Sequence, residues 1–168
     1  MKRILILGCP GSGKSTAAKR LAKKINIPVV HLDKLFWRDG WMNVSREEFD
    51  ALLEDEMKKD AWIIDGNYSR TVAWRLQCAD TAIFFDYPTY ICLWRVIKRV
   101  FLKYGVSRSD MGGNCPEKID LEFLNYVARF RRTQRGKMLE LLSAAKDVNV
   151  IIIKNIQQFK KFEAEFLI

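Results

Sequence analysis

The chain has 168 residues, of which 49% are hydrophobic and 29% charged, and its formal net charge is +9. This length suits one ordinary folded domain, and the composition excludes a disordered chain, so we expect a single domain over 1–168. No apolar run approaches the roughly 20 residues of a membrane span, and the run that starts the chain, 4–7, is too short for a secretory signal; we therefore expect a cytoplasmic protein that does not enter a membrane.

In chain order, five short apolar runs are typical of buried strands, at 3–7, 28–32, 62–65, 81–86 and 148–153. Segments of helical length lie between and after them, at 14–25, 45–59, 69–78, 88–104, 120–145 and 156–166. This alternation predicts an α/β fold whose five-stranded parallel sheet is covered by helices on both faces. Residues 105–118 contain three glycines and one proline with little apolar content, which predicts a mobile, lid-like insertion between two long helices.

The sequence GCPGSGKST follows the first predicted strand and precedes the first predicted helix. Gly8, Gly13, Lys14 and Ser15 fit the phosphate-loop pattern G-x-x-x-x-G-K-[ST], in which glycines let backbone amides approach phosphate oxygens closely. Lys14 is then expected to contact the β- and γ-phosphates, and the Ser15 hydroxyl to bind Mg²⁺. The pattern predicts that ATP is bound by Gly8, Cys9, Pro10, Gly11, Ser12, Gly13, Lys14, Ser15 and Thr16.

A dinucleotide site is the alternative, because Asp33 follows Gly13 by twenty residues, as a ribose-binding acid would. The glycine spacing and the Lys14–Ser15 pair favour the phosphate loop. Asp65 ends the third predicted strand, where a carboxylate can orient a water molecule on Mg²⁺; its alternative is a simple Asp-Gly turn with Gly66. Asp86 ends the fourth strand and is a lesser candidate for the same role.

Two windows, 95–108 and 129–137, hold ten of the 29 lysines and arginines and no acidic residue. They predict an anionic ligand between them, which leaves phosphorylated small molecules and nucleic acid open. Arginines that a lid brings to a transferring phosphoryl group stabilise its charge, so we expect catalytic roles for Arg95, Arg99, Arg131, Arg132 and Arg135. The alternative is that they are solvated or paired with Glu122, Glu140 or the acidic helix at 47–56.

The segments WIIDGNYSR (62–70) and IFFDYP (83–88), with Arg95 and Arg99 four residues apart, resemble the adenylate-kinase-like P-loop kinases. That family has a D-G-F-P-R segment after its third strand and F-D-x-P after its fourth. More narrowly, HLDKLFW, DGNY and RFRRTQR resemble the bacterial DNA topology modulation proteins, a branch of the same group. Arg70 lies one residue further from Asp65 than the arginine of the adenylate kinase segment does.

This resemblance implies ATP-dependent phosphoryl transfer to a nucleoside monophosphate or another small-molecule acceptor, with Lys14 and Asp65 in catalytic positions. It implies an acceptor site made by Asp33, Trp37, Gly66, Asn67 and Arg70, in which Asp33 contacts an acceptor hydroxyl or a water on Mg²⁺, or else caps the next helix. The alternatives are an ATP-responsive nucleic-acid-binding protein and a nucleotide-bound regulatory protein. His31 is expected to be a buried core residue without a functional role.

Overall fold

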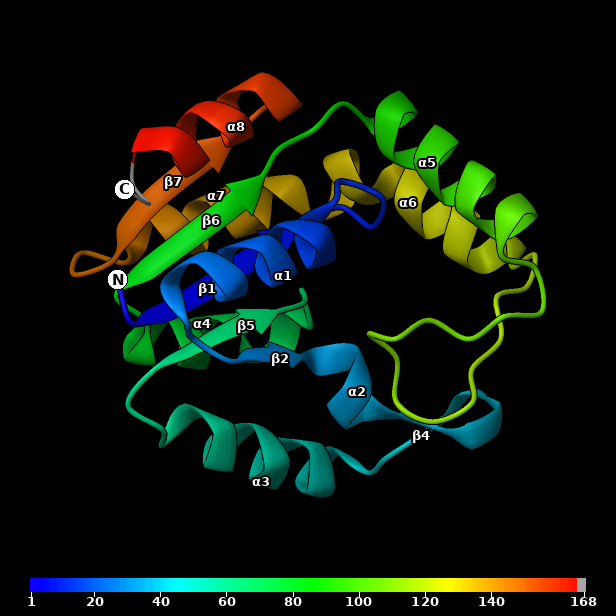
Figure 1. Ribbon diagram of the computed structural model, residues 1–168, viewed down its shortest axis with the longest axis horizontal. Helices are drawn as coiled ribbons and strands as arrows, with labels where there is room; N and C mark the ends of the chain where they lie inside the picture. Colours follow the sequence, from blue (N-terminus) through cyan, green and yellow to red (C-terminus); the bar gives the residue numbers. More distant parts are fainter. Residues whose placement is uncertain (166–168) are drawn as a thin grey trace.

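A five-stranded parallel sheet forms the centre of the protein in the computed structural model, which describes residues 1–165 (Figure 1). The strands, in their spatial order, are β2 (Val29–His31), β5 (Trp62–Asp65), β1 (Arg3–Gly8), β6 (Thr81–Phe85) and β7 (Asn149–Ile153). All five predicted strands are confirmed, each to within one residue at either end. Because β1 is central and every strand is parallel, the loops after β1, β2 and β5 meet at one edge of the sheet.

Side chains alternate between two cores, as the pleat of a strand requires. In β1, Ile4 and Ile6 enter one core, whereas Leu5 and Leu7 enter the other. The first core is covered by α1 (Lys14–Ile25), α5 (Thr89–Leu102), α6 (Leu121–Thr133) and α8 (Ile156–Glu165). The second is covered by α3 (Arg46–Met57), α4 (Ser69–Cys78) and α7 (Arg135–Ala144). The predicted helices on both faces are therefore confirmed.

None of the helices within residues 1–165 combines the length and the apolar content that crossing a bilayer requires. Residue 166, the predicted end of the last helix, lies outside the described residues.

The single helix expected over 120–145 is wrong, because α6 ends at Thr133 and α7 starts at Arg135. Phe130 of α6 packs in the first core, and Met138 of α7 packs in the second. One straight helix cannot cover both faces of a sheet, so the chain turns at Gln134 to cross from one face to the other.

A small substructure that the sequence does not predict follows β2. It contains α2 (Leu32–Phe36), β3 (Trp37–Arg38), the 3₁₀ helix η1 (Asp39–Trp41) and β4 (Met42–Asn43). β3 and β4 pair antiparallel, and we call 37–43 the hairpin. Elements of two to five residues carry too little periodicity to be recognised from sequence.

The segment between α5 and α6, residues 103–120, lies against this hairpin, and we call it the connecting segment. Figure 1 shows it running from the α5–α6 pair down to β4. The Gly112 amide donates to the Asp33 carbonyl over 3.3 Å, the Gly40 amide to the Asn114 carbonyl over 2.9 Å, and the Trp41 indole to Pro116 over 3.0 Å. Residues 105–118, for which the sequence predicts a mobile, lid-like insertion, are hydrogen-bonded to the hairpin in this structure.

Gly112→Ala is expected to weaken this contact. A Cβ atom at Gly112 would collide with the Trp37 carbonyl oxygen and lie 2.7 Å from that of Lys34, and backbone atoms cannot move aside cheaply. We expect the free energy of unfolding, measured in urea, to fall by about 1–3 kcal/mol. Gly136→Ala is the control, because nothing lies within 4 Å of a Cβ atom there and alanine in α7 gains about 0.5–1 kcal/mol. Equal unfolding midpoints for the two variants would contradict the close approach.

Candidate active site

The loop between β1 and α1 has the backbone of an anion cradle. Gly8, Gly11 and Gly13 have φ angles of 145°, 83° and 96°, which side chains rarely allow. A Cβ atom at Gly11 would also collide with the Cys92 carbonyl of α5. Gly13 precedes α1, and no side chain caps the first turn of that helix, so its amides are available to an anion.

The predicted phosphate-loop residues divide into two groups. Pro10, Gly11, Gly13, Lys14, Ser15 and Thr16 line a cleft of about 890 Å³. Gly8, Cys9 and Ser12 lie behind them, and the Cys9 thiol points into the first core, 3.8 Å from the Val127 carbonyl. The buried pair Cys9 and Ser12 therefore supports the loop, while Lys14 and Ser15 face the space where a ligand fits.

Asp65 ends β5 beside this loop and is 4% exposed. Its Oδ2 lies 2.8 Å from His31 Nδ1, which donates because an ionised carboxylate only accepts. Its Oδ1 is buried without a hydrogen-bond partner among residues 1–165. An orphaned carboxylate oxygen at the edge of a phosphate cradle fits a water molecule on Mg²⁺. His31 is buried as predicted, but it also orients Asp65, a role that the sequence analysis missed.

Asn67 joins the β5 loop to the phosphate loop. Its Oδ1 accepts from the Gly8 amide over 2.9 Å, and its Nδ2 donates to the Gly8 carbonyl over 2.8 Å. Gly66 and Asn67, which were both expected in the acceptor site, line the cleft. Gly66 packs tightly, since a Cβ atom there would lie 2.9 Å from the Leu32 Cβ.

Asn67→Asp is expected to lower the affinity for ATP at least about tenfold, because a carboxylate cannot donate to the Gly8 carbonyl and adds negative charge beside the phosphates. Titration of ATP with magnesium followed by thermal shift measures the change. Asn125→Asp, on the exposed side of α6, is the matched control and should leave the affinity unchanged. Similar affinities for the two variants would show that the Asn67 clamp does not shape the loop.

Arg95 and Arg99 both line the cleft from α5. Arg95 donates to the Ser12 carbonyl over 3.2 Å and lies over the Tyr87 ring, which holds its guanidinium beside the phosphate loop. Arg99 lies 3.0 Å from Glu117 of the connecting segment. Burial, together with the nearby charge of Arg108, lowers the pKa of Arg99.

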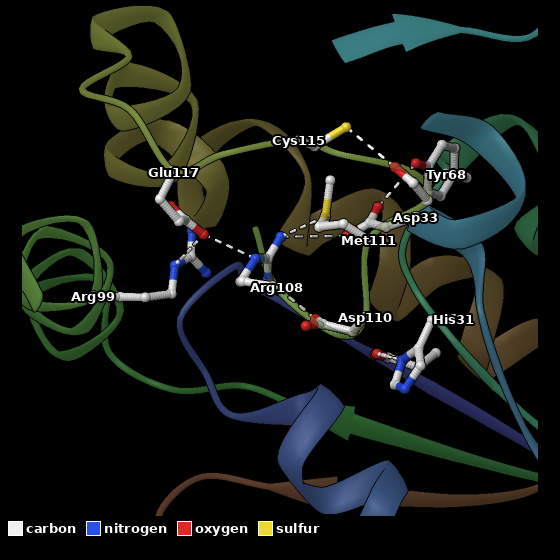
Figure 2. Close-up of polar contacts among 11 residues, drawn as sticks. His31, Asp33, Tyr68, Arg99, Arg108, Asp110, Met111, Cys115 and Glu117 are labelled. Carbon is white, nitrogen blue, oxygen red and sulfur yellow. Dashed lines mark hydrogen bonds and ion pairs between the residues drawn. The ribbon is translucent and has the colours of Figure 1, made fainter. Parts of the chain in front are cut away.

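Arg108 is a cleft residue that the sequence analysis did not single out, although the basic window at 95–108 includes it. Figure 2 shows its guanidinium between Glu117 and Asp110. The nearest nitrogen–oxygen distances are 2.8 Å to Glu117 and 3.1 Å to Asp110. Arg99 and Arg108 therefore share Glu117, and this carboxylate links α5 to the connecting segment.

The structure corrects the expected position of the arginines after the connecting segment. Arg131 and Arg135 pair with Asp86, with nitrogen–oxygen distances of 3.2 Å and 2.7 Å, and Arg132 is exposed. None of the three lines the cleft. The turn at Gln134 directs Arg135 to the end of β6, so these side chains hold α6 and α7 to Asp86, a partner that the sequence analysis did not consider.

Only some of the predicted acceptor residues line the cleft. Asp33 and Trp37 line the cleft, as do Phe36, Trp41 and Tyr68. Asp33 lies inside α2, whose N-cap is His31, so the alternative that Asp33 caps a helix is wrong. Arg70 lies outside the cleft, where its two terminal nitrogens are 2.8 Å and 2.5 Å from the carboxylate oxygens of Asp50. The extra residue between Asp65 and Arg70 places this arginine on the outer side of α4.

Three comparisons show which known proteins the chain is similar to. Residues 4–69 match the family model described as an AAA domain. The chain is 49% identical over 90 residues to the adenylate kinase of Mycobacterium leprae (strain Br4923), covering 42% of the chain and 49% of that protein. It is 30% identical over 91 residues to the adenylate kinase of Thermoanaerobacter sp. (strain X514), covering 42% of each. The chain thus spans about half the length of the curated relatives it matches.

Among solved structures, the shikimate kinase from Bacteroides thetaiotaomicron superposes with a TM-score of 0.57 at 16% identity, covering 98% of this chain and 95% of that one. At this identity the likeness concerns the fold. The five-stranded parallel sheet, the helices on both its faces and the glycine-rich loop after β1 together show that the chain has an α/β P-loop fold.

Proposed function

We propose that the protein is an ATP-dependent phosphotransferase that moves the γ-phosphoryl group of ATP to a small molecule bound in the same cleft. One observation carries this proposal: Lys14, the orphaned oxygen of Asp65 and the guanidinium of Arg95 surround one end of a cleft that continues to Asp33 and the hairpin. The similarity to adenylate kinases over part of the chain supports it.

Different residues bind the phosphates, the metal ion and the Asp65 carboxylate. The loop amides and Lys14 bind the β- and γ-phosphates, and Arg95 adds positive charge next to the same oxygens. The Ser15 hydroxyl and Asp65 Oδ1 are suited to hold Mg²⁺, directly or through its water; when bound, Mg²⁺ neutralises phosphate charge and fixes its orientation. His31 holds the Asp65 carboxylate in position. The connecting segment acts as the lid that limits water in the cleft.

The narrower resemblance to DNA topology modulation proteins stays a prediction, and no contact among residues 1–165 favours nucleic acid as a second function. Within the described chain, Arg131 and Arg135 of the second basic window are paired with Asp86. Two of the charges expected to attract nucleic acid are therefore directed at the protein itself.

A coupled assay of ADP production, run over a panel of acceptors with ATP and magnesium, tests the proposal. We expect acceptor-dependent turnover that is lost in Lys14→Ala. Thermal shift with ATP and magnesium is the parallel binding measurement, because a ligand of the native state raises its stability. Turnover that stays at a Lys14-independent background with every acceptor would remove phosphoryl transfer as the function.

A further inference from the structure

The acceptor end of the cleft presents a carboxylate. Asp33 Oδ1 accepts from the Tyr68 hydroxyl over 2.9 Å, which fixes the orientation of the group (Figure 2). Asp33 Oδ2 accepts no hydrogen bond from residues 1–165, and its nearest cation is Arg108, at 3.9 Å. The Asp33 side chain remains 40% exposed. One carboxylate oxygen is therefore fixed, and the other is free to accept a hydrogen bond from a ligand.

Two cations beside Asp33, Arg108 and Lys118, already have partners, whereas Lys14 faces the phosphate loop. Arg108 lies between Asp110 and Glu117, so most of its charge is neutralised before a ligand enters. Lys118 lies over the Trp41 ring, with its ammonium nitrogen 5.8 Å from the ring centre. Arg70, one of the residues expected in the acceptor site, pairs with Asp50 outside the cleft. A phosphate placed at this end would meet the Asp33 carboxylate without a free arginine to offset the repulsion.

We infer that the phosphoryl acceptor is an alcohol, a hydroxyl group on an uncharged ring compound, and that Asp33 Oδ2 binds and deprotonates this hydroxyl. The inference rests on the proposed function and names its substrate class. It distinguishes this site from one that phosphorylates a nucleoside monophosphate, where the acceptor atom is a phosphate oxygen.

Asp33 lies near enough to the phosphate loop for this role. Lys14 and Arg108 act on its carboxylate electrostatically, and Lys14 is the larger influence of the two. Asp33 and Lys14 also line the same cleft, so a hydroxyl bound to Asp33 shares this cleft with the phosphate loop. Partial burial raises the pKa of Asp33 above its ordinary value, although Lys14 and Arg108 oppose this, and a more basic carboxylate is a better proton acceptor.

The transfer balances without any further reactant. A lone pair of the alcohol oxygen forms the new bond to the γ-phosphorus, and the bond from this phosphorus to the β–γ bridging oxygen breaks. The electron pair of that bond leaves with ADP. The hydroxyl proton passes to Asp33 Oδ2 and from there to water after the products dissociate. The products are a phosphomonoester, ADP and a proton.

The walls near Asp33 suit a ring. Phe36, Trp37, Trp41 and Tyr68 all line this end of the cleft. Phe36 packs edge-on against Trp37, with ring centres 4.9 Å apart, and Trp37 packs against Trp41 at 5.5 Å. Half-buried aromatic faces that are held by one another offer stacking to a planar base or to the apolar face of a cyclic polyol. Together with Asp33, they favour an uncharged ring bearing a hydroxyl.

Matched acceptor pairs test the inference. Each nucleoside is compared with its monophosphate, and cyclic polyols are added, all with labelled ATP and magnesium. We expect phosphate on the alcohols: the phosphorylated acceptor, separated from ATP and ADP, should show a single phosphomonoester resonance in phosphorus NMR and not the coupled resonances of a diphosphate. Diadenosine pentaphosphate, which occupies a nucleoside triphosphate site and a monophosphate site together, should stabilise the protein no more than ATP does.

Two variants test the roles of Asp33 and Arg70 toward the acceptor separately. Asp33→Asn should keep the ATP-dependent thermal shift while lowering alcohol phosphorylation about 10²–10⁴-fold. It should also lower the slow, Lys14-dependent hydrolysis of ATP in which water takes the place of the acceptor. Asp55→Asn, on the exposed side of α3, is the matched control. Arg70→Ala should behave as wild type with alcohols, whereas an acceptor phosphate gripped by this arginine would make that variant inactive.

The outcomes are distinct. A diphosphate formed from the acceptor monophosphates, or strong extra stabilisation by diadenosine pentaphosphate, would overturn the alcohol acceptor and leave the proposed kinase activity intact. Unchanged Lys14-dependent hydrolysis in Asp33→Asn would overturn the role of Asp33, whichever acceptors are available. The absence of any ATP-dependent thermal shift in the wild-type protein would instead overturn the proposed function itself.

Discussion

Lys14→Ala is expected to abolish the ATP-dependent thermal shift and to lower phosphoryl transfer about 10²–10³-fold or more, while the fold stays intact. The lysine is the first residue of α1 and lies half-buried at the cleft. Its side chain makes no hydrogen bond within residues 1–165. Its charge therefore contributes to ligand binding more than to stability. Thermal shift with and without ATP and magnesium, followed by the coupled assay, measures both effects.

The control for Lys14→Ala is Lys23→Ala, which removes an exposed lysine from the last turn of the same helix. Both variants lower the net charge by one, so a nonspecific electrostatic effect on ATP would appear equally in the two. We expect the ATP-dependent thermal shift to remain in Lys23→Ala and to be absent in Lys14→Ala. An equal ATP-dependent shift in Lys14→Ala and wild type would place the nucleotide away from the loop after β1.

The features that sequence predicts well are local. The phosphate loop depends on a strand, nine residues and the first turn of a helix, all contiguous, and the structure shows positive φ at Gly8, Gly11 and Gly13. The buried strands also follow from the sequence, because a parallel sheet covered on both faces needs apolar residues at successive positions, as in β1. For the same reason, Asp65 could be placed at the carboxyl edge of the sheet.

The features that sequence does not predict are tertiary pairings. Arg131 and Arg135 pair with Asp86, about 45 residues earlier in the chain, and this pairing depends on where α6 ends. Charge alone does not identify the partner, since Glu122 and Glu140 are nearer in sequence. Arg70 similarly pairs with Asp50 on α3, 20 residues earlier in the chain, and its spacing from Asp65 does not identify that partner.

The second large effect is expected at Arg75, a residue of α4 that is completely buried. Its guanidinium donates to the Gly66 carbonyl over 2.9 Å and to the Asn67 carbonyl, and its Nε to the Thr71 hydroxyl over 3.2 Å. Burial lowers the pKa of Arg75 to about 9, and the nearby charge of Asp65 opposes this, so the group is still protonated at neutral pH. It is the internal support of the loop after β5.

Arg75→Ala is expected to lower the free energy of unfolding by about 3–5 kcal/mol, because buried carbonyls left without a donor cost about 1–3 kcal/mol each and a cavity is added. Urea unfolding measures the loss. Arg70→Ala is the control: this exposed arginine lies on the same helix, and its surface pair with Asp50 contributes about 0–1 kcal/mol.

Arg75→Lys separates charge from geometry, since an ammonium keeps the charge but cannot reach several carbonyls with a planar fork. We expect it to recover only part of the lost stability. Because Asn67 and Tyr68 extend from the loop that Arg75 supports, ATP affinity and the Tyr68–Asp33 hydrogen bond should weaken together in both Arg75 variants. Wild-type stability in Arg75→Ala would show that the loop is held by its other contacts, and the clamp of Asn67 on Gly8 would then have to position the phosphate loop without this support.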